Sequence, residues 1–330
     1  MVNESYLSVT AHFVDSNWAL NHRTLATLPL DDNHSGDNIA CWLSQAMEKY
    51  QVPSSKVVAL VHDNGSNMVA ACKLLEAQHG WASVRCTAHT IQLLVHAALK
   101  TPAIADVFVI ARRVVEHFRR SALSTAMLHG KQDQMSVPNH QLVLEVSTRW
   151  NSTLAMVQRL LEQRWPVSAV LSDKGGCNRT GCQNLSNEQW DILGNLETLL
   201  KPFEAATVFV SGEVYVTASA VSRIIKTLCT KMSVKPDDPQ YVSEFKQIAM
   251  RQLEERWSLD YSNLTRENEK RCLTVLKAAA LDPRFQLWLY RSRNGATCPG
   301  TACCRSHNIS NAAATADHSV RLARNRRSSG

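Results

Sequence analysis

Asp63 is the residue of this chain whose type and position best fit metal or acid chemistry. It follows a run of β-branched and apolar residues at 57–61 and stands within the turn sequence His-Asp-Asn-Gly-Ser-Asn. Such a run predicts a buried strand, and ligands of open α/β sheets bind at the carboxyl ends of strands. Asp63 is therefore placed to hold a divalent metal or to polarise a water molecule. The alternative is that Asp63 serves only as a turn residue or helix N-cap.

Cys86 and His89 form a second candidate pair. The sequence predicts a short strand over residues 82–85 and a helix that starts directly after it. Two side chains three residues apart then share one helical turn, close to the sheet edge that carries Asp63. Such a pair fits half a zinc site, a redox pair or ordinary packing of a buried thiol and a hydrogen-bonded imidazole.

Two further groups of residues fit contacts with nucleic acid. Arg149 and Trp150 place a cation beside an aromatic ring, a combination used on single-stranded or flipped bases. The alternative is a buried tryptophan that anchors the following helix. On a helix predicted over residues 102–130, four arginines gather on one side: Arg112, Arg113, Arg119 and Arg120. This face suits phosphate contacts, or else it is a solvated face paired with acids such as Glu116.

Five motifs, in this order along the chain, resemble the transposase domain of the hAT superfamily: HDNGSNM, CTAHTIQLL, RVVEHFRRS, STRWNSTLAM and ALDPRF. The likeness is closest to the domesticated zinc finger BED domain-containing proteins of animals and covers roughly residues 5–286. It implies a ribonuclease-H-like α/β core interrupted by a large helical insertion. It also implies that Asp63 is the second acid of the family's Asp-Asp-Glu triad. Cys86 and His89 match the family's Cys-x-x-His motif, and Trp150 matches a tryptophan that helps to handle DNA ends.

The predicted elements follow the order of such a core after its first strand. We expect a hairpin of strands 6–14 and 18–30, and then, in turn, a helix at 38–50, the strand at 57–61, a helix at 68–80 and the strand at 82–85. In the family the first strand carries the first catalytic Asp, and it is expected to be missing here because only residues 1–4 precede the hairpin.

Three domains are predicted along the chain. A further strand over residues 141–146 completes a partial ribonuclease-H-like core at 5–151. Helical periodicity then dominates a predicted insertion domain at 152–290, with helices at 152–165, 186–200, 217–232, 240–257 and 266–281. Residues 291–330 are rich in Ala, Ser, Asn and Arg without periodicity, so we expect a disordered basic tail.

Charge and cysteine content limit the function classes. The net charge of +7 is concentrated in the tail, whose seven arginines and one acid give 7 − 1 = +6. The remaining 29 basic and 28 acidic residues leave the body at +1, so any DNA contact must use local patches. Ten cysteines without a regular framework favour a reducing compartment. No apolar run reaches the ~18 residues of a membrane span, so no membrane partner is expected.

The expected function is that of a transposon-derived, catalytically inactive nuclear protein that resembles DNA-binding transcription regulators and acts through protein or DNA contacts. Of the three acids implied by the resemblance, only Asp63 is present, and two-metal strand transfer needs several converging carboxylates. No cofactor is expected with certainty: Mg²⁺ would bind at Asp63 in an active site, and zinc belongs to a BED finger that full-length relatives carry. Homodimerisation is expected to be weakened, because the family's C-terminal dimerisation segment is not recognisable. The alternatives are an active transposase or nuclease completed by another chain, and a scaffold resembling ligases of the small ubiquitin-like modifier.

Overall fold

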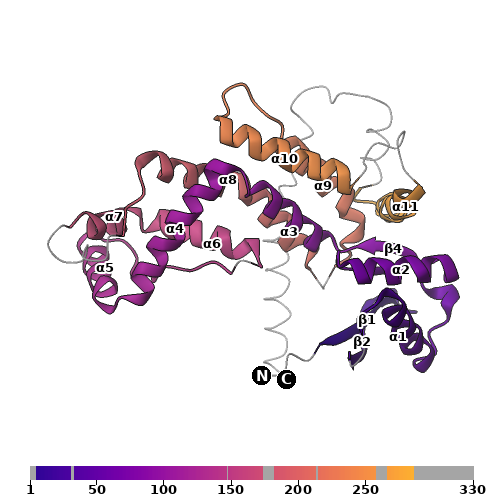
Figure 1. The fold of residues 1–330 in the computed structure, drawn as a ribbon. Coiled ribbons are helices and arrows are strands. Elements are labelled where there is room, and N and C mark those ends of the chain that lie inside the picture. The colour runs from indigo at the N-terminus through magenta and orange to yellow at the C-terminus, as the bar shows by residue number, and fades with distance from the viewer. Residues whose placement is uncertain are drawn as a thin grey trace, which may run out of the picture. The chain divides into compact units, whose positions relative to one another are not determined.

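The protein is described from a computed structural model, which covers residues 5–30, 33–146, 148–173, 182–212, 215–257 and 266–285. It divides into two compact units (Figure 1). The first unit comprises residues 1–90, 205–226 and 257–330, and the second unit comprises residues 91–204 and 227–256. The predicted tail at 291–330 lies outside the described residues. No single helix in the part of the chain that is described is both long and apolar enough to cross a membrane; only the bent pair 87–98 and 102–120 would pass by length and composition.

The first unit begins with the predicted hairpin. Strands β1 (Tyr6–Val14) and β2 (Leu20–Pro29) pair antiparallel, with a register shift after Val9. The Asp15 carboxylate organises the turn, because its Oδ1 accepts hydrogen bonds from the backbone N–H groups of Asn17 and Ala19, both at 2.9 Å. These two bonds, with a third from the Asn21 side chain, lower the pKa of Asp15 despite the opposing effect of desolvation. Asp15 therefore fixes the turn that joins the two strands of the predicted hairpin.

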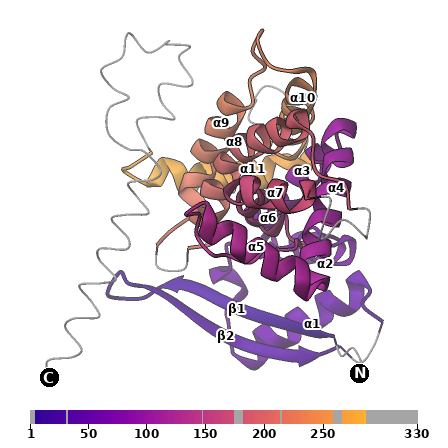
Figure 2. The same cartoon turned by 90° about the vertical axis from the view of Figure 1, so that its left-hand side faces the viewer.

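Only one part of the hairpin contributes to the core of the first unit. Helix α1 (Gly36–Lys49) lies beside the hairpin (Figure 2), and Val9 is buried in a cluster with Ile39 and Leu43 of α1 and Leu75 of helix α2 (Ser66–His79). The helices α1 and α2 approach each other closely at Gly36, where an added Cβ would lie 2.7 Å from Cβ of Ala70. A glycine is required at this crossing for steric reasons.

The second pair of strands carries the predicted site. Strands β3 (Ala59–His62) and β4 (Ala82–Arg85) are parallel and lie on either side of α2 in the sequence. Helix α2 ends, as predicted, at Gly80, whose φ of +78° is the left-handed conformation that glycine adopts readily. The described strands form two two-stranded sheets, so the chain is α/β with a large helical part. Their union in one ribonuclease-H-like sheet stays a prediction.

Helices make up the rest of the described chain: α3 (Thr87–Ala98), α4 (Pro102–Arg120), α5 (Ala122–Gln134), α6 (Trp150–Glu162), α7 (Arg164–Ser172), α8 (Asn187–Val210), α9 (Val221–Lys231), α10 (Gln240–Arg256) and α11 (Arg266–Leu281). A short 3₁₀ turn, η3 (Ala218–Ala220), precedes α9. Helices α4 to α7 pack within the second unit. The predicted domain boundary at residue 151 stays a prediction.

The single helix predicted over residues 102–130 is wrong. The chain leaves the helical conformation at Ser121, with φ −109° and ψ 109°, and begins α5 after it. The Ser121 hydroxyl accepts a hydrogen bond from the backbone N–H of Ser124 at 3.1 Å, which is an N-cap. A serine that caps a new helix competes with continuation of the old one, and this outweighed the continuous apolar stripe.

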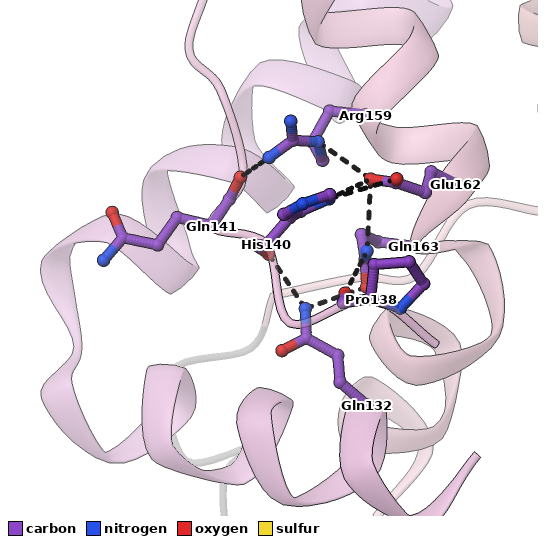
Figure 3. Close-up of polar contacts among 7 residues, drawn as sticks. All are labelled: Gln132, Pro138, His140, Gln141, Arg159, Glu162 and Gln163. Carbon is purple, nitrogen blue, oxygen red and sulfur yellow. Dashed lines mark hydrogen bonds and ion pairs between the residues drawn. The ribbon is translucent and has the colours of Figure 1, made fainter. Parts of the chain in front are cut away.

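The strand predicted over residues 141–146 is not formed. Three backbone carbonyls, two just before the predicted strand and one at its first residue, accept hydrogen bonds from side chains of α5 and α6 or the residue that follows α6: Pro138 from Gln163 at 2.9 Å, His140 from Gln132 at 2.8 Å, and Gln141 from Arg159 at 2.7 Å (Figure 3). A strand needs its carbonyls for a neighbouring strand, and at Gln141, the first residue of the predicted strand, a side-chain donor takes that place.

A buried pair of glutamines lies at the centre of this network. Gln132 Nε2 donates to Gln163 Oε1 at 2.8 Å, and both side chains are fully buried. Glu162 accepts from Arg159 Nε at 2.9 Å and lies 3.1 Å from Nδ1 of His140 (Figure 3). The pKa of Glu162 is lowered; its desolvation opposes this, and its hydrogen bonds to His140 and Gln163 cause it. The network thus joins α5, α6 and the segment at 138–141.

Replacing Gln163 by leucine tests this network. The variant leaves the Pro138 carbonyl without its donor and the Gln132 side-chain N–H without one acceptor, so we expect the free energy of unfolding to fall by about 1–3 kcal/mol. Urea denaturation followed by circular dichroism measures the change. The matched control is Gln134→Leu, because Gln134 is exposed at the end of α5, and it should cost less than about 0.5 kcal/mol. Equal effects in the two variants would contradict the role of the network.

Asp282, in the turn that follows α11, connects this turn to η3. Its Oδ2 accepts from the Ser219 hydroxyl at 2.7 Å and from Arg284 Nη2 at 2.6 Å, and its Oδ1 accepts from the Arg284 backbone N–H at 3.0 Å. The hydrogen bond from Arg284 holds the pKa of the Asp282 carboxyl well below its usual range, although partial desolvation opposes it. The motif ALDPRF therefore has a structural role in the first unit.

The lowered pKa predicts how stability depends on pH. A carboxyl with a depressed native pKa stabilises the fold above its unfolded pKa of about 4, and this contribution is lost as the pH falls through the native value. Asp282→Asn should therefore lower the free energy of unfolding by roughly 1 kcal/mol at pH 7, with a smaller difference from wild type at each step below about pH 4. Urea titrations between pH 3 and 7 measure this. The control is Asp133→Asn, a change at an exposed residue. If Asp282→Asn lowered the free energy of unfolding by the same amount at every pH in this range, the explanation would be contradicted.

Candidate functional site

The parallel pairing of β3 and β4 brings two of the predicted site residues to one edge. His62 pairs with Arg85 at the carboxyl ends of the strands, and Asp63 and Cys86 are the residues that follow. The backbone N–H of Cys86 donates to the His62 carbonyl at 2.6 Å. Asp63 and the start of α3 therefore lie at the same sheet edge, where the sequence placed them.

The Asp63 side chain takes part in the turn that leads into α2. Its Oδ1 accepts a hydrogen bond from the backbone N–H of Gly65 at 2.9 Å, and the residue is exposed. A Cβ at Gly65 would lie 3.0 Å from Oδ1 of both Asp63 and Asn67, which is tight for any side chain. The Asp-Asn-Gly-Ser-Asn sequence thus builds a compact turn around the carboxylate. Metal binding by Asp63 stays a prediction.

His62 and Asn64 flank Asp63 and fix the turn, although sequence reasoning did not select them. His62 is 5% exposed, and its two ring nitrogens lie 2.6 Å from the Asp63 carbonyl and 2.9 Å from the Ser83 hydroxyl. The Asn64 amide donates to Thr90 Oγ1 at 3.0 Å. The available signal was the position of both residues beside an acid at a strand end, where a polar side chain needs a partner.

Cys86 and His89 stand at the beginning of α3 and are half-buried. The Cys86 carbonyl accepts from the backbone N–H of Thr90 at 2.9 Å and from its hydroxyl at 2.8 Å, which starts the helix. Among the residues that the structure describes, no three His, Cys, Asp or Glu side chains are grouped to hold a metal ion. The choice between a redox pair, half a zinc site and core packing therefore stays open for this pair.

A second thiol lies near the turn. Cys72 is buried on α2, and burial raises its pKa to about 11, with the charges of Asp63 and Glu76 adding to the effect. A thiol with this pKa is protonated at neutral pH and is a poor nucleophile. Cys72 is 1% exposed and packs inside the first unit.

Arg149 and Trp150 lie in the second unit, and the structure separates their roles. Trp150 is the first residue of α6 and is only 1% exposed, whereas Arg149 is exposed. An aromatic ring that stacks on a base must present a face to solvent, and the buried ring of Trp150 does not. The predicted base-stacking role of Trp150 is therefore wrong for this conformation. Burial favours the alternative, in which Trp150 anchors α6 together with Leu154 and Val157 on the same face.

Gln92 of α3 holds the backbone on both sides of Arg149. Its Nε2 donates to the Thr148 carbonyl at 2.5 Å, and its Oε1 accepts from the Trp150 backbone N–H at 3.2 Å. The second amide hydrogen points to His96 Nε2 at 2.7 Å. Burial lowers the pKa of His96, with Lys100 adding and Glu145 opposing, so the ring is neutral and able to accept. No short-range pattern signals a contact between residues 56 positions apart.

The arginines of α4 are only partly available. Arg112 forms an ion pair with Glu145, and Arg120 pairs with Glu116 at 3.2 Å. Arg113 and Arg119 are exposed. The face predicted from the i, i+1, i+7, i+8 spacing is present, but it is neither wholly free nor wholly paired.

Gln92→Leu tests the clamp on the Arg149 turn. The variant removes the acceptor of the Trp150 amide and the donor to the Thr148 carbonyl, so exchange of the Trp150 amide hydrogen should become about tenfold faster or more. Hydrogen exchange resolved to this peptide measures the rate. Gln45→Leu, an exposed change on α1, is the control and should leave the rate unchanged. Equal protection of the Trp150 amide in Gln92→Leu and wild type would refute the clamp.

Two family models match the chain. The model described as the ZBED1 RNase-like domain matches residues 1–86, and the model described as the ZBED1 RNase-like helical domain matches residues 84–199. The junction of the two matches lies at the Cys-x-x-His segment. The first match includes Asp63 and Cys86, and the second includes Arg149 and Trp150.

Relatives from animals, plants and fungi each match about two thirds of the chain. Human zinc finger BED domain-containing protein 4 is 29% identical over 230 residues, which is 67% of this chain and 18% of the relative. A putative AC transposase of Zea mays is 26% identical over 229 residues, 66% of this chain and 28% of the relative. The putative transcriptional regulator tpeD of Talaromyces stipitatus is 23% identical over 265 residues, 69% of this chain and 30% of the relative. The chain thus spans less than a third of each of these proteins.

Proposed function

Because the chain belongs to the hAT-like, zinc finger BED-type family of domesticated transposase domains, we propose that it acts as a nuclear, transposon-derived protein that binds DNA and regulates transcription. The fungal relative is named a putative transcriptional regulator, and this name supports the proposed role in transcription. The proposal includes a ribonuclease-H-like origin for the first unit. It also includes protein partners that associate with the chain when it is bound to DNA.

The observation that carries the DNA-binding proposal is the presentation of Arg149. Its guanidinium is exposed, and the backbone on either side of it is held by Gln92. A cation on a fixed turn loses less conformational freedom on binding a phosphate than one on a mobile loop. Arg112 pairs with Glu145, in the segment that leads to Arg149, and Arg113 and Arg119 add two exposed cations within the same unit. Local cations of this kind suit a protein whose net charge outside the tail is small.

The state of Asp63 supports binding without strand cleavage. One oxygen of this carboxylate holds the turn at Gly65 through a hydrogen bond of 2.9 Å. A carboxylate that bridges catalytic metals presents its oxygens to two ions about 4 Å apart, together with further carboxylates. We propose that Asp63 here is a structural remnant that keeps the sheet edge in shape. The alternative is a nuclease completed by another chain. The name of the maize relative, putative AC transposase, is the reason to test this alternative as well.

DNA binding by the full chain tests the proposal. We expect fluorescence anisotropy with a labelled duplex to show salt-dependent binding, and Arg149→Ala to weaken it and reduce the slope of log K against log salt by about 1, as expected for one lost phosphate contact. Arg251→Ala, an exposed arginine of α10, is the matched control and should leave the slope unchanged. Binding that is the same in wild type and Arg149→Ala would contradict the proposed contact.

Cleavage is measured on the same duplex with Mg²⁺ or Mn²⁺. We expect no metal-dependent nicking by wild type and the same DNA affinity for Asp63→Asn as for wild type. Nicking that disappears in Asp63→Asn would instead support the enzymatic alternative.

A further inference from the structure

Two histidines face each other across the hairpin of the first unit. His12 of β1 and His22 of β2 are direct partners in the antiparallel register, and their ring centroids are 6.1 Å apart with an interplanar angle of 31°. Both residues are exposed. His12 lies three positions from buried Val9 along β1, so alternation places it on the face of the strand opposite to the core.

From this pairing we propose that His12 and His22 form a chelating site for a divalent transition metal of the Zn²⁺ class. Neutral imidazoles are ligands for Zn²⁺, Ni²⁺ and Cu²⁺, whereas Mg²⁺ and Ca²⁺ prefer oxygen. Two Zn–N bonds of about 2.0–2.1 Å at a tetrahedral angle place the ring centroids roughly 5 Å apart. The observed separation is about 1 Å larger, and rotation of two exposed side chains closes such a gap without moving the backbone.

A neighbouring residue orients the first ligand. The Thr10 hydroxyl lies 3.4 Å from Nε2 of His12, on the same strand and the same face. Metal-binding histidines characteristically donate their second ring N–H to a nearby oxygen, which fixes the tautomer and leaves the other nitrogen free for the metal. Thr10 is placed to accept from Nε2–H and so to leave Nδ1 of His12 as the ligand atom.

The nearby carboxylate completes the turn rather than the site. Asp15 accepts hydrogen bonds from the backbone of Asn17 and Ala19 and from the Asn21 side chain. The two imidazoles therefore provide the protein ligands of the proposed site, and water fills the remaining positions of the metal. A chelate of this kind ties β1 to β2 in the part of the hairpin that lies beyond the register shift.

Zn²⁺ titration calorimetry on the full chain tests the site. Because both imidazoles are needed for chelation, His12→Gln and His22→Gln should each remove one binding event or raise its apparent Kd by about tenfold or more. Differences between variants cancel the contribution of the cysteines. His79→Gln removes an exposed histidine outside the pair and should bind Zn²⁺ as wild type does.

A register control separates pairing from histidine content. Arg23→His in the His22→Gln background restores the number of histidines but places the imidazole on the opposite face of β2. We expect this double variant to bind Zn²⁺ no better than His22→Gln. Recovery of wild-type affinity in the double variant, or unchanged affinity in His12→Gln, would overturn the proposal. Circular dichroism confirms that each variant keeps the fold.

Discussion

The hydrogen bond from the Cys86 backbone N–H to the His62 carbonyl continues the parallel pairing of β3 and β4 beyond the strands themselves. Both strands are short, so the edge depends on the contacts around it. Asn64 reaches Thr90 of α3 from the turn after β3, and the buried His62 ring connects this turn to Ser83 of β4. Hydrogen bonds thus connect the end of β3, the turn after it and the start of α3, and these contacts fix the position of Asp63.

Local patterns predicted most of the elements of the first unit. The two hairpin strands were predicted close to where β1 and β2 lie, and the helix predicted to end at residue 80 does end there, at the left-handed Gly80. The adjacency of Asp63 and Cys86 was also predictable, because parallel strands place their carboxyl ends at one edge. These features depend on residues close in the sequence or on a general rule of sheet geometry.

The remaining features depend on side chains that meet from distant positions. Gln132 and Gln163 donate to the backbone carbonyls of His140 and Pro138, and Gln92 holds the turn around Arg149. Hydrophobic periodicity carries no information about which carbonyl a glutamine will reach. The burial of Trp150 was one of two alternatives that the sequence left open, and tertiary packing decided between them.

The hydrogen bonds that side chains donate to the backbone carbonyls at residues 138–141 also have a consequence for association between molecules. The segment 141–146, Gln-Leu-Val-Leu-Glu-Val, is rich in β-forming residues and is the type of sequence that pairs with a second chain when its backbone is open. Pro138, His140 and Gln141 already have hydrogen-bonded carbonyls, and buried Leu142 fastens the segment to the second unit. Arg159 thus occupies the first carbonyl of this segment, and the glutamines occupy two carbonyls just before it, so polar side chains disfavour β-pairing with a second chain at this point.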